Sequence, residues 1–360
     1  PGPLTGLTSI NGGQVGGSRN KIINGAMEIN QRGTAAVATD QAFPSDRFKT
    51  AEAGGGNMTC QVVADAPASF RNSIKAIAST ADDCSQAADE YRILHRIEGN
   101  NVVDLYYGNS GAKTTTLSFW VKSSLTGNFP VGLENSASNR THVKQYTINS
   151  ADTWEKKSVT FVGDETGTWL ITNGTGLNVN FVLGAGSNYT GTIDSWQGSR
   201  LYRGSSSVQF MATVNATYFV TGVQLEVGST ATDFEYRTFG EELALCQRYY
   251  EQSYNYGVAV GTTTYDGGSF VGGSATTRTT GYIAGGSIDF RVEKRGDPTI
   301  VAYDQAGASG KSQRYELGVS NTNNSAIAIG HTDLRNFMCY SNTGSNATGL
   351  FLHFTATAEL

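Results

Sequence analysis

Apolar and polar residues alternate along most of this chain. Leu117, Phe119 and Val121 fall on one side of such a segment, and Ser118 and Lys122 fall on the other. Successive side chains of a β-strand point to opposite faces, so a period of two predicts strands with one apolar and one polar face. Two half-apolar sheets bury their apolar faces against each other. The pattern therefore predicts an all-β chain built of sandwiches.

The alternation returns twice more before residue 238. Its apolar positions are Val179, Phe181 and Leu183 in one segment, and Val223, Leu225 and Val227 in the other, where Gln224 and Glu226 form the polar face. Turn-rich pieces such as AGGGN (53–57) separate the strands. One short helix, over residues 82–90, is expected to interrupt them. We expect residues 21–238 to form a jelly-roll β-sandwich.

Residues 239–253, FGEELALCQRYYEQS, break the alternation. Phe239, Leu243, Cys246 and Tyr250 are spaced 4, 3 and 4 apart, which places them on one helix face. A helix of about 15 residues is marginal alone in water, so this stripe must pack on something. It either docks onto its own domain or makes a three-helix contact on an oligomer axis. We expect a short linking helix here.

Strand patterns return after residue 253. The chain ends on apolar residues at every second position, which are Leu350, Leu352, Phe354, Ala356, Ala358 and Leu360. Tyr315, Leu317 and Val319 form another apolar face. A last strand that alternates to its end is expected to be paired in a sheet. Residues 254–360 therefore predict a second, smaller C-terminal β-sandwich.

Composition supports this reading and narrows the function. The chain has 44 glycines and only 16% charged residues, which suits many turns and few helices. A net charge of −5 without a basic block argues against nucleic acid as a partner. No apolar run is long enough to cross a membrane, and no leader is evident, so synthesis in a cytoplasm is expected. The four cysteines are far apart and are expected to be free, buried thiols.

The first 20 residues carry many glycines and no charge before Arg19. Such a segment cannot bury enough surface to fold alone. It is either a floppy terminus or an extended docking arm that becomes ordered on a neighbouring subunit.

Several motifs resemble structural proteins of tailed bacteriophages. The stretch FVTGVQLEVGSTATDFEYRTFGEELALCQRYYE (219–251) is similar to the end of carbohydrate-binding-module-like jelly rolls in phage tail fibres. Further segments that resemble phage structural proteins are RNKIINGAMEINQRGT (19–34), SDRF (45–48), TLSFWVKSSLTG (116–127), YTINSADTWEKKSVTF (146–161) and LFLHFTATAEL (350–360). The resemblance covers most of residues 19–360, and these segments are the parts that carry it most clearly.

The resemblance implies a virion protein, assembled in the host cytoplasm and located in the phage tail. It implies a homotrimer with a glycan-binding type of fold. We expect a tail-fibre subunit that attaches to a host cell-surface glycan and docks on other virion proteins through the N-terminal arm. A capsid decoration or head fibre is an alternative on the same fold. A tailspike that degrades polysaccharide is a second alternative.

Sugar binding needs aromatic faces beside polar loop residues. The candidates are Trp154, Trp169, Trp196 and Tyr202. Each has a competing interpretation as a core or interface residue, because large aromatic side chains are usually mostly buried. Glu235, Tyr236 and Arg237 follow the last strand of the jelly roll, and we expect the arginine to pin the chain there.

No catalytic motif is present, so we expect no enzymatic activity. The adjacent acids Asp82–Asp83 and Asp89–Glu90 are expected to be solvated surface. The histidines show no metal-ligand spacing, and His353 is expected at a surface or interface. The resemblance leaves a structural calcium open, since jelly rolls of sugar-binding modules often hold one, but no calcium-loop motif marks a site.

Overall fold

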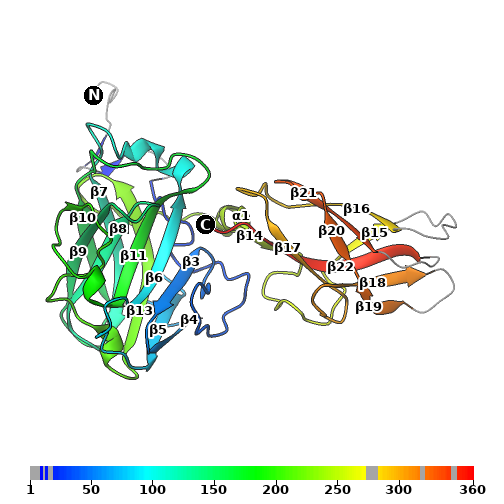
Figure 1. Cartoon of the computed structure of the whole chain (residues 1–360), viewed down its shortest axis with the longest axis horizontal. Helices are drawn as coiled ribbons and strands as arrows, with labels where there is room; N and C mark the ends of the chain where they lie inside the picture. Colours follow the sequence, from blue (N-terminus) through cyan, green and yellow to red (C-terminus); the bar gives the residue numbers. More distant parts are fainter. Residues whose placement is uncertain (1–8, 11–12, 15–18, 273–282, 317–320, 342–346) are drawn as a thin grey trace. The chain divides into compact units, whose positions relative to one another are not determined.

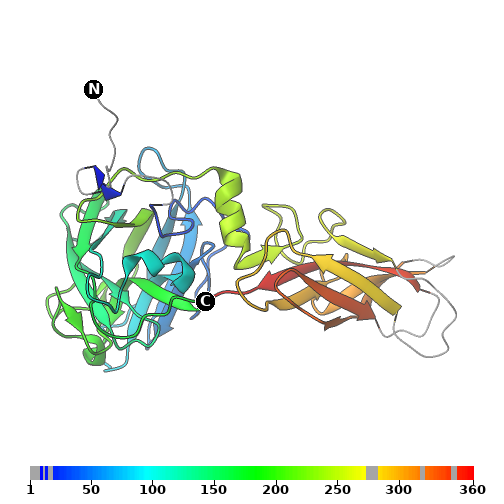
Figure 2. The same cartoon turned by 90° about the horizontal axis from the view of Figure 1, so that it is seen from above.

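A computed structural model describes residues 9–10, 13–14, 19–272, 283–316, 321–341 and 347–360. The described chain is nearly all β-structure in antiparallel sheets, with one α-helix in these ranges (Figures 1 and 2). It divides into two compact units. Unit 1 comprises residues 1–30, 34–239 and 360, and unit 2 comprises 31–33 and 240–359. The all-β prediction is confirmed.

Unit 1 is a jelly-roll sandwich of two antiparallel sheets. Its five-stranded sheet has the order β10-β7-β13-β5-β4, with β4 Asn57–Val63, β5 Ser73–Thr80, β7 Thr115–Ser123, β10 Glu155–Phe161 and β13 Thr217–Val227. Its six-stranded sheet has the order β12-β9-β8-β11-β6-β3, with β3 Phe48–Ala53, β6 Glu90–Glu98, β8 Gly127–Glu134, β9 Thr141–Ile148, β11 Thr175–Ala185 and β12 Trp196–Gln197. Short 3-10 turns occur at η1 Gly99–Asn101, η2 Val103–Leu105, η3 Ser187–Tyr189 and η4 Phe210–Ala212.

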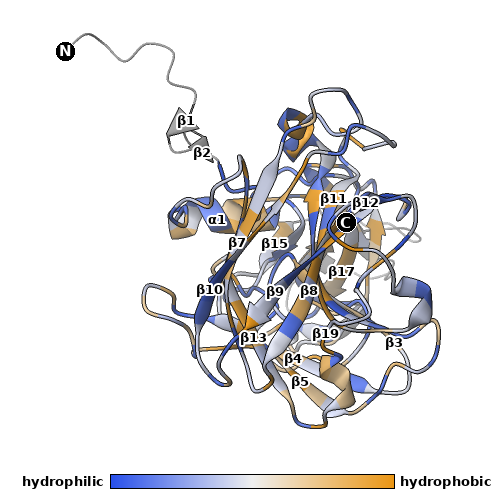
Figure 3. Ribbon diagram, turned by 90° about the vertical axis from the view of Figure 1, so that its left-hand side faces the viewer, coloured by the Kyte–Doolittle hydropathy of each residue, from blue (hydrophilic) through white to orange (hydrophobic). Residues whose placement is uncertain are grey.

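The core of unit 1 lies between the two sheets. Leu117, Phe119 and Val121 of β7 point inward and are fully buried, as the alternation predicts. Phe119 meets Phe181 of β11 edge to face, with 5.1 Å between ring centroids. Burying each such side chain contributes about 1.5–3 kcal/mol relative to leaving it exposed. Figure 3 shows hydrophobic and hydrophilic residues interspersed along the strands.

The polar face of β13 departs from the prediction. Gln224 and Glu226 are fully buried rather than facing water. The segment that follows the strand folds back over them, and Thr232 donates both its backbone N–H and its hydroxyl to the Glu226 carboxylate at 2.8 and 2.7 Å. Alternation reports which side chains share a face but not what covers that face.

No helix forms over residues 82–90. Asp82 accepts a hydrogen bond from the backbone N–H of Cys84 at 2.8 Å, and Asp83 accepts one from Ser85 at 3.0 Å. Short polar side chains that bond the backbone two residues on stabilise turns instead of helix. Cys84 itself is left-handed, with φ 53°. The helix prediction is therefore wrong for this loop.

Unit 2 is organised around its last strand, β22 Ala347–Thr357. This strand pairs antiparallel with β14 Tyr250–Gln252, β15 Ser269–Gly272, β17 Thr299–Tyr303 and β18 Lys311–Glu316, and β19 Thr322–Ala326 pairs with β18. A second sheet holds β16 Ile283–Asp289, β21 Asn336–Ser341 and β20 Ala328–Gly330. Leu352, Phe354 and Phe337 form part of the buried core. The paired terminal strand is confirmed, whereas the face containing Leu317 and Val319 lies outside the described residues.

His353 of β22 is buried instead of lying at a surface. Its ring stacks on Tyr254 with 3.9 Å between centroids. Nδ1 lies 3.2 Å from the Ser253 hydroxyl, and Nε2 lies 3.0 Å from the Thr264 carbonyl. Burial lowers the pKa of this imidazole. Both faces of the strand are therefore covered, which alternation alone does not predict.

The linking helix is shorter than predicted. Helix α1 spans Phe239–Gln247, and Tyr250 lies instead on β14, opposite Thr357 of β22. The buried ammonium of Lys294 donates to the Gln247 carbonyl and to the Glu251 carboxylate, both at 2.6 Å. A cation at the last carbonyls favours the end of a helix there.

Because the helix ends at Gln247, it contains only three of the four residues predicted to share one helix face. Phe239 is 50% exposed, Leu243 is half-buried and Cys246 is buried. Tyr250 lies outside the helix, on β14.

All four cysteines are buried and free, as predicted. The described part of the chain holds no helix long and apolar enough to cross a membrane.

Three residues from early in the sequence belong to unit 2. Gln31 donates to the Tyr250 carbonyl at 2.8 Å. The Arg32 guanidinium lies 3.6 Å from the centroid of the Tyr250 ring and 3.0 Å from the Glu359 carboxylate. Unit 2 is therefore built from two separate stretches of the sequence.

Candidate functional site

A small apolar pocket lies in unit 1, between two loops that join strands of the sandwich. One loop contains η1 and η2 between β6 and β7, and the other connects β10 to β11. Its volume is about 120 Å³. The lining residues are Val102, Val103, Leu105, Tyr106, Tyr107, Asn109, Trp169, Leu170, Ile171 and Leu177.

The two loops are joined by backbone hydrogen bonds. Gly99 donates to the Gly174 carbonyl at 2.8 Å, and Asn100 donates to the Thr172 carbonyl at 2.9 Å. A Cβ at Gly99 would collide with the Leu170 carbonyl and would lie 2.7 Å from that of Thr172. Only glycine allows this approach, so the sequence at this position fixes the spacing of the loops.

The loop that carries Trp169 is held by a partly buried ion pair. Arg140 donates through Nε and Nη2 to the two oxygens of Asp164, at 2.7 and 2.6 Å. The hydrogen bonds that Arg140 donates to the Asp164 carboxylate raise the pKa of Arg140. The Asp164 carbonyl also accepts the backbone N–H of Gly108 at 2.7 Å, which ties this loop to its partner. Bidentate arginine–carboxylate pairs fix geometry as well as charge.

Trp169 belongs to an aromatic cluster that forms part of the pocket wall. Its ring centroid is 4.9 Å from that of Tyr107 and 5.3 Å from that of Trp196, in edge-to-face contacts. The indole N–H donates to the Thr166 carbonyl at 3.2 Å. The Tyr107 hydroxyl shares a hydrogen bond of 2.9 Å with Thr115. Burial raises the pKa of Tyr107 well above its usual value, so this phenol stays neutral.

The rim of the pocket exposes large apolar side chains. Val103 is 48% exposed, Tyr106 53%, Leu170 38% and Ile171 58%. Four such residues lie around one pocket, and exposed apolar side chains gathered in this way are a common feature of binding surfaces. Sequence reasoning missed them. The signal was present in VVDLYY (102–107) and WLI (169–171), which are apolar runs without alternation between turn residues.

The four predicted sugar-binding aromatics do not come together. Trp169 and Trp196 are in contact, and only Trp169 lines the pocket. Trp154 lies elsewhere in unit 1, where its N–H donates to Asp65 at 3.2 Å. Tyr202 is buried against Tyr189, with the Arg92 guanidinium 4.1 Å from its ring centroid. Tyr202 therefore offers no ring face to a ligand, which corrects its assignment.

Tyr202 belongs instead to a buried polar cluster on the outer side of the six-stranded sheet. Arg92 donates to Asn180 at 2.7 Å and lies 3.7 Å from the Glu134 carboxylate. Glu134 accepts the Tyr202 hydroxyl at 3.4 Å. Arg200 contacts Glu134 from the loop between β12 and η4, at 3.4 Å. Glu90 pairs with both arginines as well, at 3.3 and 3.5 Å. Two carboxylates thus balance two guanidinium groups, and we assign this cluster to holding that loop on the sheet.

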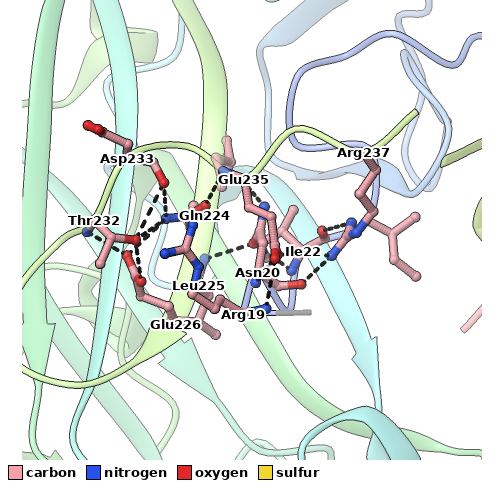
Figure 4. Close-up of polar contacts among 12 residues, drawn as sticks. Arg19, Asn20, Ile22, Gln224, Leu225, Glu226, Thr232, Asp233, Glu235 and Arg237 are labelled. Carbon is pink, nitrogen blue, oxygen red and sulfur yellow. Dashed lines mark hydrogen bonds and ion pairs between the residues drawn. The ribbon is translucent and has the colours of Figure 1, made fainter. Parts of the chain in front are cut away.

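The stretch with the most specific resemblance has a structural role around β13. Figure 4 shows how residues 232–237 return across the strand and meet the N-terminal segment at residues 19–22. Glu235 accepts the backbone N–H of Asn20 at 2.7 Å. Arg237 donates to the carbonyls of Asn20 and Ile22. Arg237 therefore joins the segment after β13 to the start of the jelly roll. We predicted that this arginine fixes the chain after the last strand, and its partners are residues 20 and 22.

Two carboxylates of unit 1, those of Asp82 and Glu226, are already bonded to protein donors. Asp82 accepts hydrogen bonds from the N–H groups of Gly55 and Gly56 and from the Tyr91 hydroxyl, the last at 2.6 Å. Glu226 is bonded to Thr232 and Gln224. These two sites do not fit a structural calcium. Among the described residues there is no group of three or more His, Cys, Asp or Glu that could hold a metal ion.

Comparisons with known proteins gave matches to solved structures alone. No protein-family model and no curated protein matches the sequence. The enzymatically active domain of tailspike protein 4 of bacteriophage CBA120 aligns at 11% identity and TM-score 0.31, over 59% of this chain and 22% of that one. The xylan-binding domain CBM22-1 of Paenibacillus barcinonensis Xyn10C aligns at 11% identity and TM-score 0.27, over 62% and 100%.

A family 11 carbohydrate-binding module of Clostridium thermocellum, in complex with a mixed-linked tetrasaccharide, aligns at 10% identity and TM-score 0.28. It covers 56% of this chain and 99% of that one. Identities and TM-scores this low say nothing of what this chain binds. This chain spans about a fifth of the tailspike domain.

Proposed function

We propose that this chain is a glycan-binding subunit of a tailed-phage particle, and that it binds through the pocket between the η1–η2 loop and the β10–β11 loop. The observation that carries the binding proposal is the exposed apolar rim around Trp169 and Tyr106. Aromatic and aliphatic surfaces pack against the CH faces of sugar rings, and this pocket presents both on loops fixed by hydrogen bonds.

The virion part of the proposal rests on the motif resemblance of residues 219–251. In the structure, residues of that stretch bond to the start of the jelly roll. In this proposal the chain is a trimeric tail-fibre subunit that binds without catalysis, with its N-terminal arm on other virion proteins. That arm, residues 1–20, lies mostly outside the described residues.

The trimer has its own test. Light scattering of the purified chain is expected to give three times the 38.2 kDa mass of one chain. A monomer mass at micromolar concentration would contradict the trimer and leave the binding proposal standing.

Binding is tested with the full chain and three single variants. The probes are purified O-chain and capsular polysaccharides from several bacteria, immobilised on a sensor surface. We expect Trp169→Ala and Ile171→Asp to abolish binding. Ile171 is 58% exposed, so its variant changes the pocket rim with little effect on folding. Trp154→Ala is the matched control, because Trp154 lies away from the pocket.

The outcomes separate clearly. Loss of binding in both pocket variants, with normal binding by Trp154→Ala, would support the assignment. Equal binding by all three variants would mean that glycan is held elsewhere on the chain. No binding of any polysaccharide by the intact protein would contradict the glycan-binding function. Release of reducing ends from a bound polysaccharide would contradict binding without catalysis.

A further inference from the structure

The pocket is unusually poor in polar groups for a sugar site. Of its ten lining side chains, Asn109 and the two tyrosines alone carry hydrogen-bonding atoms outside the Trp169 indole N–H. The Tyr107 hydroxyl is bonded to Thr115, and the indole N–H is bonded to Thr166. The Asn109 amide N–H donates to the Tyr107 carbonyl at 3.3 Å. Little remains on the pocket wall to receive the hydroxyl groups of a ligand.

A sugar hydroxyl that enters such a wall loses its bonds to water and gains few in return. Burying a polar group without a partner is costly, whereas burying a methyl group is favourable. The part of a ligand that enters this pocket is therefore expected to be carbon. Hydroxyl groups of the same sugar can remain outside, where Tyr106 and the solvent can bond them.

Size and charge narrow the ligand further. A volume of about 120 Å³ is close to the roughly 150 Å³ of an apolar cavity that holds benzene. This is room for a methyl or acetyl group and the adjoining edge of one ring. The ten lining residues include no Lys or Arg, and the neighbouring Asp104 is paired with Lys21 at 2.7 Å. Nothing on this wall would attract an acidic sugar.

We propose that the pocket selects a neutral pyranose that carries a methyl-bearing substituent, either the methyl of a 6-deoxy sugar or the methyl of an acetyl group. This inference rests on the proposed glycan-binding function and names its substrate class. The methyl group packs against Trp169 and the apolar rim of Val103, Leu170 and Ile171. The two sources share one chemistry, and the experiment separates them.

The test compares matched sugars that differ only in the methyl-bearing group. One arm uses D-galactose against 6-deoxy-D-galactose and L-mannose against 6-deoxy-L-mannose. The other arm uses D-glucose against N-acetyl-D-glucosamine. Each sugar is displayed in many copies on a polymer so that weak binding is measurable. Burial of one methyl group predicts at least roughly fourfold tighter binding of the methyl-bearing member.

Saturation-transfer NMR on the free sugars gives a second readout. We expect the strongest transfer at the methyl protons of the preferred sugar. Ile171→Asn is expected to remove the preference, because it places a polar amide on the rim. Val214→Asn is the control: Val214 is 55% exposed and lies between η4 and β13, outside the pocket lining.

A methyl preference in either arm that Ile171→Asn removes would support the inference, and the arm identifies the substituent. Equal binding within every pair, or a preference for the hydroxyl member, would overturn it while leaving glycan binding intact. Binding of bacterial polysaccharides without any of the six sugars, and without deoxy or acetyl groups, would also overturn it. Failure to bind any sugar or polysaccharide would contradict the proposed function itself.

Discussion

At the scale of single residues, His142 shows how burial sets the chemistry of a side chain. Its ring lies edge to face against Phe161 and Trp196, with both pairs of centroids 5.1 Å apart. Burial, assisted by the charge of Lys144, lowers the pKa of His142 to about 4. Between about pH 4 and pH 6.5, the imidazole is therefore mainly neutral in the folded protein, whereas it is mainly protonated in the unfolded chain.

This depressed pKa makes jelly-roll stability depend on pH. An unfolded histidine binds a proton below about pH 6.5, and the folded His142 does so only near pH 4. In that window the unfolded state binds more protons, so the free energy of unfolding falls as pH falls. His142 lowers the free energy of unfolding by at most about 1.4 kcal/mol for each pH unit by which the pH falls. Urea unfolding of His142→Phe should show a shallower pH dependence than wild type. An identical dependence would mean that this site does not titrate differently on unfolding.

Aromatic residues illustrate what composition cannot decide at this scale. Trp169 and Tyr202 were equally good candidates for sugar binding, because each follows or precedes polar loop residues. Trp169 lines a pocket, whereas Tyr202 is covered by Tyr189 and Arg92. The difference comes from the contacts between loops that are distant in sequence. No local pattern around either residue contains that information.

At the scale of elements, the pocket depends on the contact between two loops, and that contact depends on Gly99. Alanine at this position would force the Leu170 and Thr172 carbonyls away. We expect Gly99→Ala to lower the free energy of unfolding by roughly 1–3 kcal/mol and to weaken glycan binding. Denaturant unfolding and the polysaccharide sensor assay measure both. Gly198→Ala is the control, because a Cβ there meets nothing within 4 Å.

If Gly99→Ala unfolds as wild type does and binds equally well, the two loops are not coupled as described. If it is destabilised and still binds normally, the pocket forms without the contact.

The strands themselves were predictable from sequence, and their surroundings were not. The apolar positions of β7, β11 and β22 follow a period of two, which reports the pleat of the backbone directly. The outer face of β13 was misjudged because the segment that follows the strand folds back over it. The ring of His353 was misjudged because a distant segment, at Thr264, covers it. The helix over 82–90 failed for a local reason, since two aspartates there bond backbone N–H groups of a turn.

At the scale of the whole molecule, the chain forms two units whose sequences interleave. Arg32 contributes to unit 2, with its guanidinium over the Tyr250 ring and against Glu359. Its side chain is 20% exposed and that of Glu359 is 8% exposed, so solvent screens the pair only in part. A partly buried cation–aromatic contact of this kind contributes more than an ion pair in open water.

We expect Arg32→Ala to destabilise unit 2 by about 1–2 kcal/mol. Hydrogen exchange should then speed up in β14 and β22, while strands of unit 1 keep their rates. Arg335→Ala is the control, because Arg335 is 78% exposed in its pair with Glu293 and should contribute under about 1 kcal/mol. Equal exchange in both variants would show that Arg32 does not stabilise unit 2.

The interleaving of residues 31–33 with residues 240–359 also constrains how such a gene can change. A single crossover near residue 240 would transfer residues 240–359 without Gln31 and Arg32. These two residues bond to unit 2 at Tyr250 and at Glu359. A terminal unit from another gene would then meet residues 31 and 32 of this chain, which are not complementary to its own residues. Exchange of whole terminal units between genes therefore requires two matched segments, and diversification of this unit by substitution within it is the simpler route.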